Sequence, residues 1–365
     1  MTKDEIIDQM RINAETGRLS DLKEYLSYSS ANPERHFVKT DNAFTRKARL
    51  LQAIRRWQSG AGCGSFVRKG ITYYHPNLAV GGEQSGCNFL HPVIFNYAKF
   101  RVQNKKPYET IEEDRLYNNF LSSQPMAFNL FVPLMEIIKC EEGERRLAAV
   151  VTRLLDPNGV LGIARIYEVG VEFIPDYYKE CLNDKTAMDA YLRYLRPDGQ
   201  RGIIAIETKY TDMLGTNQAS DPSLAIKMAT EVDSITGIFT DEGKSGIKSG
   251  NIILSQVYRN FLLTETVRLH EHLSNSLSIV LAPKENDSNL ADEQQLEQIL
   301  KEEFRYKFQA VTLETFVDSI INEFPDEDIF RRFKHRYLDF RPAEWLEKSE
   351  YAVTSLKLNE MPKTN

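Results

Sequence analysis

Two opposite charges end the apolar run of residues 203–210. Glu207 and Lys209 are separated by a single residue. Alternate residues of a strand share a face, so both side chains should leave the same side of the strand. A buried carboxylate or ammonium is unfavourable unless it is paired, binds a metal ion or takes part in chemistry. The run therefore predicts a buried strand that ends in a functional site or in an ion pair.

A third charged residue, Asp189, lies on the strand predicted just before this run. The turn at residues 197–200 contains Asp-Gly, a hairpin signal. Folding this hairpin brings Asp189 beside Glu207 and Lys209, and we expect a register shift of one residue, or a bulge, to place all three on one face. The simpler alternative is a surface salt bridge between Asp189 and Lys209.

Two carboxylates and a lysine at one end of a sheet suit the hydrolysis of a phosphodiester. Asp189 and Glu207 offer the hard oxygen ligands that Mg²⁺ prefers, and the carbonyl of Thr208 could complete the set. A bound metal ion polarises the phosphate and lowers the pKa of a bound water. Lys209 would orient that water or stabilise the charge of the transition state. The residues alone therefore favour a metal-dependent nuclease.

The elements around these residues follow the order helix, three strands, helix, strand. Apolar periodicity and turn signals predict this order between residues 110 and 282. The predicted elements are helical residues 110–138, strands 160–173, 187–195 and 202–210, a helix within 251–270 and a strand at 277–282. We predict an α/β fold with a mixed central sheet flanked by helices.

This ordered set resembles the PD-(D/E)XK nuclease superfamily, which has a restriction-endonuclease-like αβββαβ core. Asp189 followed by Glu207-Thr208-Lys209 carries the resemblance. It is strongest to a group of bacterial restriction-endonuclease-like proteins with little functional description, through residues 121–131, 184–189, 206–212 and 256–260. About half of the chain, residues 110–285, is covered.

The resemblance implies roles for individual residues. Asp189 and Glu207 would bind Mg²⁺ or Mn²⁺, and Lys209 would be catalytic. The second core helix of the family often turns a polar residue toward the site, and Gln256 fits that place. These residues, with the carbonyl of Thr208, form the expected site.

Two choices stay open at this point. Family members often add a carboxylate, for which Glu168 on the first strand is one candidate and Glu112 or Glu113 is another. The literal Pro-Asp pair of this chain ends at Asp176, before the hairpin, whereas Asp189 follows a methionine. The hairpin geometry favours Asp189 as the metal aspartate, with Asp176 as the alternative.

The resemblance implies an endonuclease that cuts DNA in bacterial restriction or anti-phage defence. Such nucleases often pair two copies to cut two strands, so we expect a homodimer or a partner protein of a defence system. The alternative is a nucleic-acid-binding or assembly subunit that keeps the fold without cleaving. Metal binding distinguishes the two hypotheses.

Composition bounds these expectations. The chain has 365 residues, 42% hydrophobic and 27% charged, which is typical of a globular protein. Its net charge of −6 argues against polyanion binding by the whole surface. We find neither an apolar run of 18 residues nor a signal peptide core near residue 1, and therefore expect a cytoplasmic protein without a membrane span.

Accessory regions flank the predicted core. Residues 1–109 form a helical and Gly-rich region, residues 286–355 a helical region, and residues 356–365 a disordered tail. The helix predicted at 44–57 would either expose a solvated basic face or contact phosphates through Arg46, Lys47, Arg49, Arg55 and Arg56.

The four cysteines are scattered along the chain and favour free thiols. A zinc site is the alternative in the Gly-rich region, where its ligands would be Cys63, His75, Cys87 and His91.

Overall fold

The computed structural model describes residues 41–68, 71–211, 221–287 and 290–348. The helices predicted within residues 1–40 and the tail predicted at 356–365 lie outside the described residues. By compactness the chain divides into two units, each built from more than one segment of the sequence. The region boundaries that we predicted at residues 109, 285 and 355 stay a prediction. Unit 1 comprises Met1–Pro92, Glu113–Pro125 and Arg332–Asn365, and unit 2 comprises Val93–Glu112 and Met126–Arg331.

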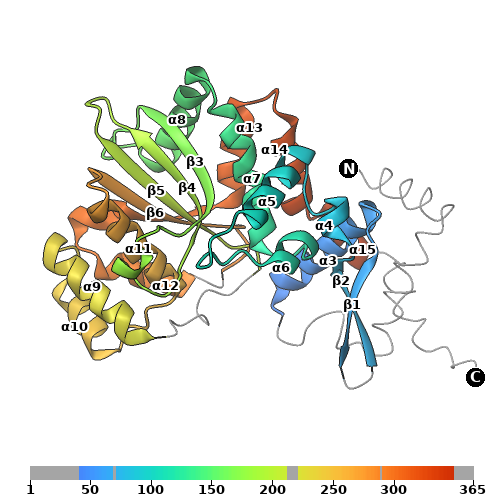
Figure 1. Ribbon diagram of the computed structural model, residues 1–365, viewed down its shortest axis with the longest axis horizontal. Helices are drawn as coiled ribbons and strands as arrows, with labels where there is room; N and C mark the ends of the chain where they lie inside the picture. The colour runs from blue at the N-terminus through green and yellow to red at the C-terminus, as the bar shows by residue number, and fades with distance from the viewer. Residues whose placement is uncertain (1–40, 69–70, 212–220, 288–289, 349–365) are drawn as a thin grey trace, which may run out of the picture. The chain divides into compact units, whose positions relative to one another are not determined.

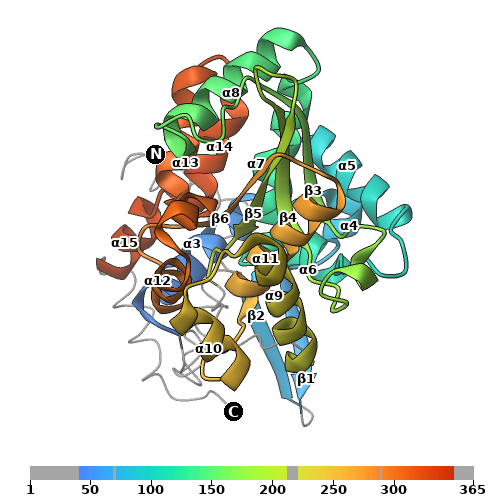
Figure 2. The ribbon, with the colours of Figure 1, turned by 90° about the vertical axis from the view of Figure 1, so that its left-hand side faces the viewer.

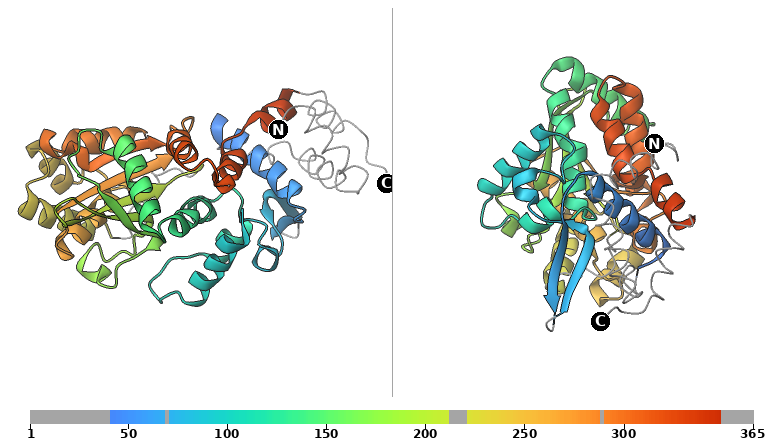
Figure 3. Two further views of the ribbon diagram at one scale, coloured as in Figure 1. Left: turned by 90° about the horizontal axis from the view of Figure 1, so that it is seen from above. Right: turned by 90° about the vertical axis from the view of Figure 1, so that its right-hand side faces the viewer.

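Unit 1 contains a small antiparallel sheet and several short helices. The β1–β2 hairpin is the blue two-stranded ribbon of Figure 3. Helix α3 packs on β2, and α15 packs on α3. The elements of this unit are α3 (Ala43–Gln58), β1 (Cys63–Arg68), β2 (Ile71–Ala79), α4 (Gly82–Ser85), α6 (Glu113–Asn118) and α15 (Arg341–Lys348).

Helix α3 forms as predicted, but most of its basic residues have structural roles. Arg55 and Arg56 are only 6% and 1% exposed. Arg55 donates to the carbonyl of His335 at 2.7 Å, and Arg56 donates to that of Ala61. Arg49 forms an ion pair with Asp41 at 2.8 Å. The predicted basic face, whether solvated or bound to phosphate, is therefore wrong for these arginines, because backbone carbonyls and a carboxylate already bind them.

The predicted zinc ligands do not form a cluster. Among the described residues, no group of three or more His, Cys, Asp or Glu side chains could hold a metal ion together. Cys63 instead contacts the carbonyl of His75, with its sulfur 3.4 Å from the oxygen. All four cysteines are free thiols, as expected.

Unit 2 is built on a five-stranded mixed sheet in the order β3-β4-β5-β6-β7 (Figure 1). The β3–β4 and β4–β5 pairs are antiparallel, whereas β5–β6 and β6–β7 are parallel. The strands are β3 (Arg165–Phe173), β4 (Met188–Leu195), β5 (Arg201–Thr208), β6 (Asn275–Ala282) and β7 (Phe308–Thr312). The α/β class and the mixed sheet flanked by helices are confirmed.

Helices cover the sheet of unit 2 (Figures 1 and 2). Helix α11 packs on β5 and β6, and its apolar side shares one core cluster with α9, α10 and α12. Helix α8 packs on β3, and α13 packs on α8 and β7. Their bounds are α8 (Glu141–Leu155), α9 (Pro222–Thr236), α10 (Asp241–Ser249), α11 (Gln256–His270), α12 (Leu290–Ile299) and α13 (Leu313–Glu323).

The remaining elements are short or cross the boundary between the units. Helices α5 (Pro92–Gln103), α7 (Ser123–Ile137) and α14 (Asp328–Tyr337) each give residues to both. The 3-10 turns η2 (Tyr178–Glu180) and η4 (Glu302–Lys307) precede β4 and β7 respectively. The αβββαβ core consists of α8, β3, β4, β5, α11 and β6, and α9 and α10 are inserted between β5 and α11.

Two parts of the core differ from the prediction. After the helical residues predicted at 110–138, residues 141–155 form a further helix, α8, because Cys140 caps it and Glu141, Glu142 and Glu144 suit its positive end. Strand β7 was not predicted, since it lies within residues 286–355, which we expected to be helical. The C-terminal region therefore adds a strand to the sheet.

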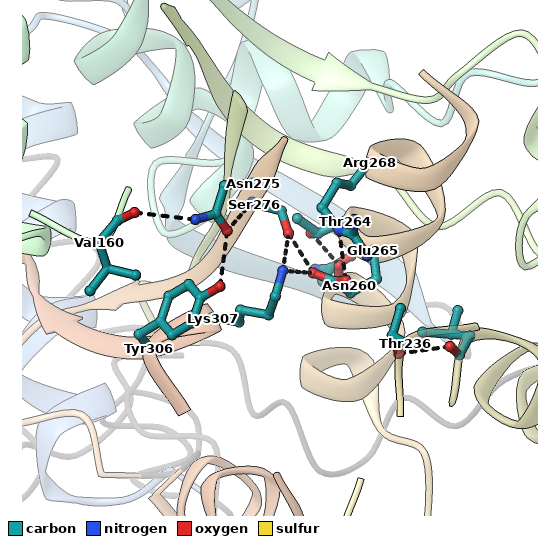
Figure 4. Close-up of polar contacts among 11 residues, drawn as sticks. Val160, Thr236, Asn260, Thr264, Glu265, Arg268, Asn275, Ser276, Tyr306 and Lys307 are labelled. Atoms are coloured by element: carbon teal, nitrogen blue, oxygen red, sulfur yellow. Dashed lines mark hydrogen bonds and ion pairs between the residues drawn. The ribbon is translucent and has the colours of Figure 1, made fainter. Parts of the chain in front are cut away.

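A buried polar network fastens α11 to the start of β6 and to Lys307, the last residue of η4 (Figure 4). Lys307 donates to Glu265 and to Ser276, each at 2.9 Å. Arg268 binds the other oxygen of Glu265 at 2.9 Å. Burial opposes ionisation of Glu265, but the two cations and the hydrogen bonds outweigh it and lower its pKa. The carboxylate is thus charged and held by partners from separate segments.

Candidate functional site

The β4–β5 hairpin places Asp189 opposite Glu207. Its register runs without interruption from Leu195↔Arg201 to Ala190↔Ile206. The next position pairs residue 189 with residue 207, and directly opposed residues of antiparallel strands point to the same face. The predicted register shift or bulge is therefore wrong, because the hairpin brings the two carboxylates together without it.

Glu207 and Lys209 form a buried ion pair. The Nζ atom of Lys209 lies 2.6 Å from Oε1 of Glu207. Glu207 is only 2% exposed and Lys209 only 5% exposed. Asn260 of α11 donates a hydrogen bond to the second carboxylate oxygen, Oε2. The alternative of a surface salt bridge between Asp189 and Lys209 is wrong, because Lys209 is buried against Glu207.

Helix α11 supplies the polar residue expected from the second core helix. Gln256 is its first residue, and its side-chain oxygen accepts a hydrogen bond from Lys209 at 3.0 Å. The backbone N–H of Lys209 donates to the carbonyl of Leu281 on β6 at 2.9 Å. The lysine is therefore fixed at its backbone by β6 and at its tip by β5 and α11.

Asp189 is half-buried and is tied to the end of β5. Its Oδ2 atom accepts hydrogen bonds from the backbone N–H of Thr208 at 2.8 Å and from its hydroxyl at 3.0 Å. Thr208 thus lies at the site, where it orients Asp189 through two donors.

The site disfavours a further negative charge. Burial raises the pKa of Glu207 to about 8, and the nearby charges of Asp189 and Glu172 add to the effect, while Lys209 opposes it. Burial and the neighbouring carboxylates therefore oppose ionisation of Glu207, whereas a positive charge beside it favours ionisation.

Glu168 and Asp176 are not brought to the site. Glu168 pairs with Arg193, four residues along β4 from Asp189, and accepts a hydrogen bond from Tyr191 at 2.6 Å. Asp176 is a surface residue whose carboxylate contacts Lys106 and Tyr108. The structure therefore brings Asp189, and not Asp176, beside Glu207, and it places Glu168 against Tyr191 and Arg193.

The other carboxylates considered for the site, Glu112 and Glu113, are exposed. Sequence reasoning missed Asn260, although it lies four residues after Gln256 and such a spacing puts two side chains on one face of a helix. It also missed Glu172, which follows Glu168 at a spacing that keeps the same strand face.

The residues present fit a divalent cation with oxygen ligands. Asp189 and Glu207 supply hard donors from adjacent strands. In the described part of the chain, the buried Oδ1 atom of Asn260 accepts no hydrogen bond. Mg²⁺ is usually held by one or two carboxylates and keeps several waters, so it does not require a group of three acidic ligands.

Comparison with known proteins agrees with this geometry. A sequence model of the PD-(D/E)XK nuclease superfamily matches residues 39–339, most of the chain. No curated protein and no solved structure gives a match. Among the described residues, we find no helix long and apolar enough to cross a membrane. The match spans the sheet, the hairpin and helix α11, and the chain therefore belongs to the PD-(D/E)XK nuclease superfamily.

Proposed function

We propose that this protein is a metal-dependent endonuclease that hydrolyses phosphodiester bonds of DNA in bacterial restriction or anti-phage defence. Family membership supports the nuclease class. The observation that carries the proposal is the convergence of Asp189, Glu207 and Lys209 at one end of the sheet. A surface role would not require burying the lysine and Glu207 beside a second carboxylate.

The proposed chemistry divides among the residues of the site. Asp189 and Glu207 would hold Mg²⁺ or Mn²⁺, and the carbonyl of Thr208 would add a third oxygen. The bound ion would polarise the phosphate and acidify a water. Lys209 would stabilise negative charge on the phosphate as the attacking oxygen adds, and Gln256 holds its ammonium in place. Asn260 fixes the orientation of Glu207.

The proposed partners follow from the same class of reaction. DNA would be the substrate, and two copies of the chain, or a partner protein of a defence system, would bring two sites to two strands. Family membership and the acidic net charge of −6 favour a local binding surface over binding by the whole protein.

A second candidate function is a nucleic-acid-binding or assembly subunit that does not cleave. The contacts that already occupy the carboxylate of Glu207 favour this second candidate. Glu207 is 2% exposed, and Lys209 and Asn260 each contact one of its oxygens. In this candidate the ion pair would replace the metal permanently.

The test compares two aspartates in a cleavage assay. Supercoiled plasmid DNA is incubated with purified protein and Mg²⁺ or Mn²⁺. Wild type and Asp176→Asn should nick or linearise the DNA, because Asp176 lies on the surface with Lys106. Asp189→Asn should not. Cleavage that survives Asp189→Asn overturns the assignment of the site, and a wild type that binds DNA without cutting it supports the second candidate.

A further inference from the structure

A third carboxylate lies beside the candidate site. The register of β3 with β4 pairs Val171 with Ala190 and Phe173 with Met188, so Glu172 lies opposite Asp189. Asp189 in turn lies opposite Glu207. Directly opposed residues are about 5 Å apart between their Cβ atoms. Three neighbouring strands therefore carry acidic residues in one row at one end of the sheet.

The backbone at Glu172 is held in an unusual conformation. Its φ is 52°, in the left-handed region that non-glycine residues rarely adopt. Arg101 of α5 fastens this turn, since its guanidinium donates to the carbonyls of Val171 and Glu172, the latter at 3.0 Å. Glu109 in turn binds Arg101 at 3.2 Å. Such conformations persist where the surroundings impose them, often at functional sites.

The side chain of Glu172 is buried, with only 5% of the residue exposed. Its charge reaches the site, because it contributes to the raised pKa of Glu207. Surface solvation therefore does not account for a carboxylate at this position.

A second observation points to a ligand at the same place. Asn260 is only 3% exposed, and its Nδ2 atom donates a hydrogen bond to Glu207. Its Oδ1 atom, however, accepts no hydrogen bond in the described part of the chain. A buried acceptor without a donor is unfavourable, and a cation or one of its water molecules would satisfy it.

The described residues contain no group of three acidic side chains close enough to bind one ion directly. Mg²⁺ keeps several of its waters, and carboxylates of the outer shell bind such waters. We propose that Glu172 is the third carboxylate of this site and accepts a hydrogen bond from a metal-bound water. This inference rests on the metal-binding part of the proposed function.

The test is a calorimetric titration of the full chain with Mn²⁺. Glu172→Gln should weaken binding roughly tenfold, a typical cost of losing an outer-shell partner. Glu172→Gly should weaken it as much, while its thermal midpoint stays level or rises, because glycine adopts a positive φ without strain. Glu168→Gln is the matched control: it lies on the same strand face, is bound to Tyr191, and should bind Mn²⁺ as wild type does.

Asp189→Asn separates this inference from the proposed function. If Asp189→Asn loses Mn²⁺ while both Glu172 variants bind it as wild type does, the role of Glu172 is overturned and the metal site stands. If wild type binds no Mn²⁺, the metal-binding function fails, and this inference fails with it. If both Glu172 variants lose their cooperative thermal transition, Glu172 is a structural carboxylate and the proposal is wrong.

Discussion

The ammonium of Lys209 lies 2.6 Å from a carboxylate oxygen of Glu207, within the buried end of β5. The two residues are separated by one position, so the pair forms inside a single strand end. Gln256 binds the same ammonium at 3.0 Å. The lysine is therefore positioned by two acceptors before any substrate arrives, as preorganised electrostatic catalysis requires.

The first prediction concerns this lysine. Lys209→Met should lower the cleavage rate by at least about 100-fold, the usual loss when a preorganised donor to a transition-state oxygen is removed. Mn²⁺ binding should persist, because Asp189 and Glu207 remain and a competing cation is gone. Plasmid cleavage and calorimetry on the same preparation measure the two effects.

Lys139→Met is the control for that experiment. Lys139 is an exposed lysine, and it forms a surface ion pair with Glu136 at 2.5 Å. The Lys139→Met substitution should leave the cleavage rate unchanged. A Lys209→Met protein that cuts DNA as fast as the control would remove the lysine from the mechanism.

The second prediction is a pH dependence set by Glu207. Its pKa is raised to about 8 from an ordinary value of 4.5. A carboxyl with a raised pKa binds a proton more tightly in the folded protein than in the unfolded chain, so stability falls as pH rises from 4.5 to about 8. The thermal midpoint of metal-free wild type should therefore decline relative to that of Glu207→Gln, which stays neutral.

Bound metal should oppose this fall in the thermal midpoint with rising pH. Binding to Glu207 requires the carboxylate form, so Mn²⁺ affinity should rise with pH up to about 8 and binding should release a proton at neutral pH. Calorimetry in buffers of different ionisation enthalpy counts that proton. Parallel midpoint curves for wild type and Glu207→Gln across the window would contradict the prediction.

The shared face of Glu207 and Lys209 could be predicted from the sequence, because the alternation of side chains along a strand is a local property. The register of Asp189 could also have been read, since the turn closes with Leu195↔Arg201 and pairing outward from there reaches 189 and 207. The expected shift was an error of counting from the turn. Hairpin register depends on the length of the turn, which can be counted in the sequence.

The sequence could not show whether Glu168 or Glu172 lies beside Asp189. Glu168 and Glu172 lie on the same face of β3, and only the pairing of β3 with β4 decides which one reaches Asp189. That pairing includes an irregularity between Ile166 and Glu168, which no local pattern specifies. The choice of residue is thus a product of tertiary structure.

Long-range packing also explains the other differences. Arg55 of α3 is buried because it binds the carbonyl of His335, 280 positions away in the sequence. Strand β7 has five residues and pairs only with β6, so its pattern is too short to distinguish it from a helix end. Both features depend on partners that a local reading does not contain.

The third prediction concerns the network that fastens α11, the helix that carries Gln256 and Asn260. Lys307 and Glu265 are buried, and their ion pair is 2.9 Å long. Removing one partner leaves the other charge buried, so Lys307→Met or Glu265→Gln alone should each cost roughly 3–5 kcal/mol of unfolding free energy. The double variant should cost much less than the sum of the two, because it leaves neither of the paired charges uncompensated.

Urea unfolding followed by far-UV circular dichroism measures this double-mutant cycle. The exposed pair Lys139 and Glu136 provides a matched cycle in which coupling should be small, because solvent screens surface charges. Since α11 joins the network to the site, Lys307→Met should also weaken Mn²⁺ binding under native conditions, and the double variant should recover it. Additive costs in the Lys307–Glu265 cycle would show that the two residues stabilise the fold independently and that the network does not position the helix.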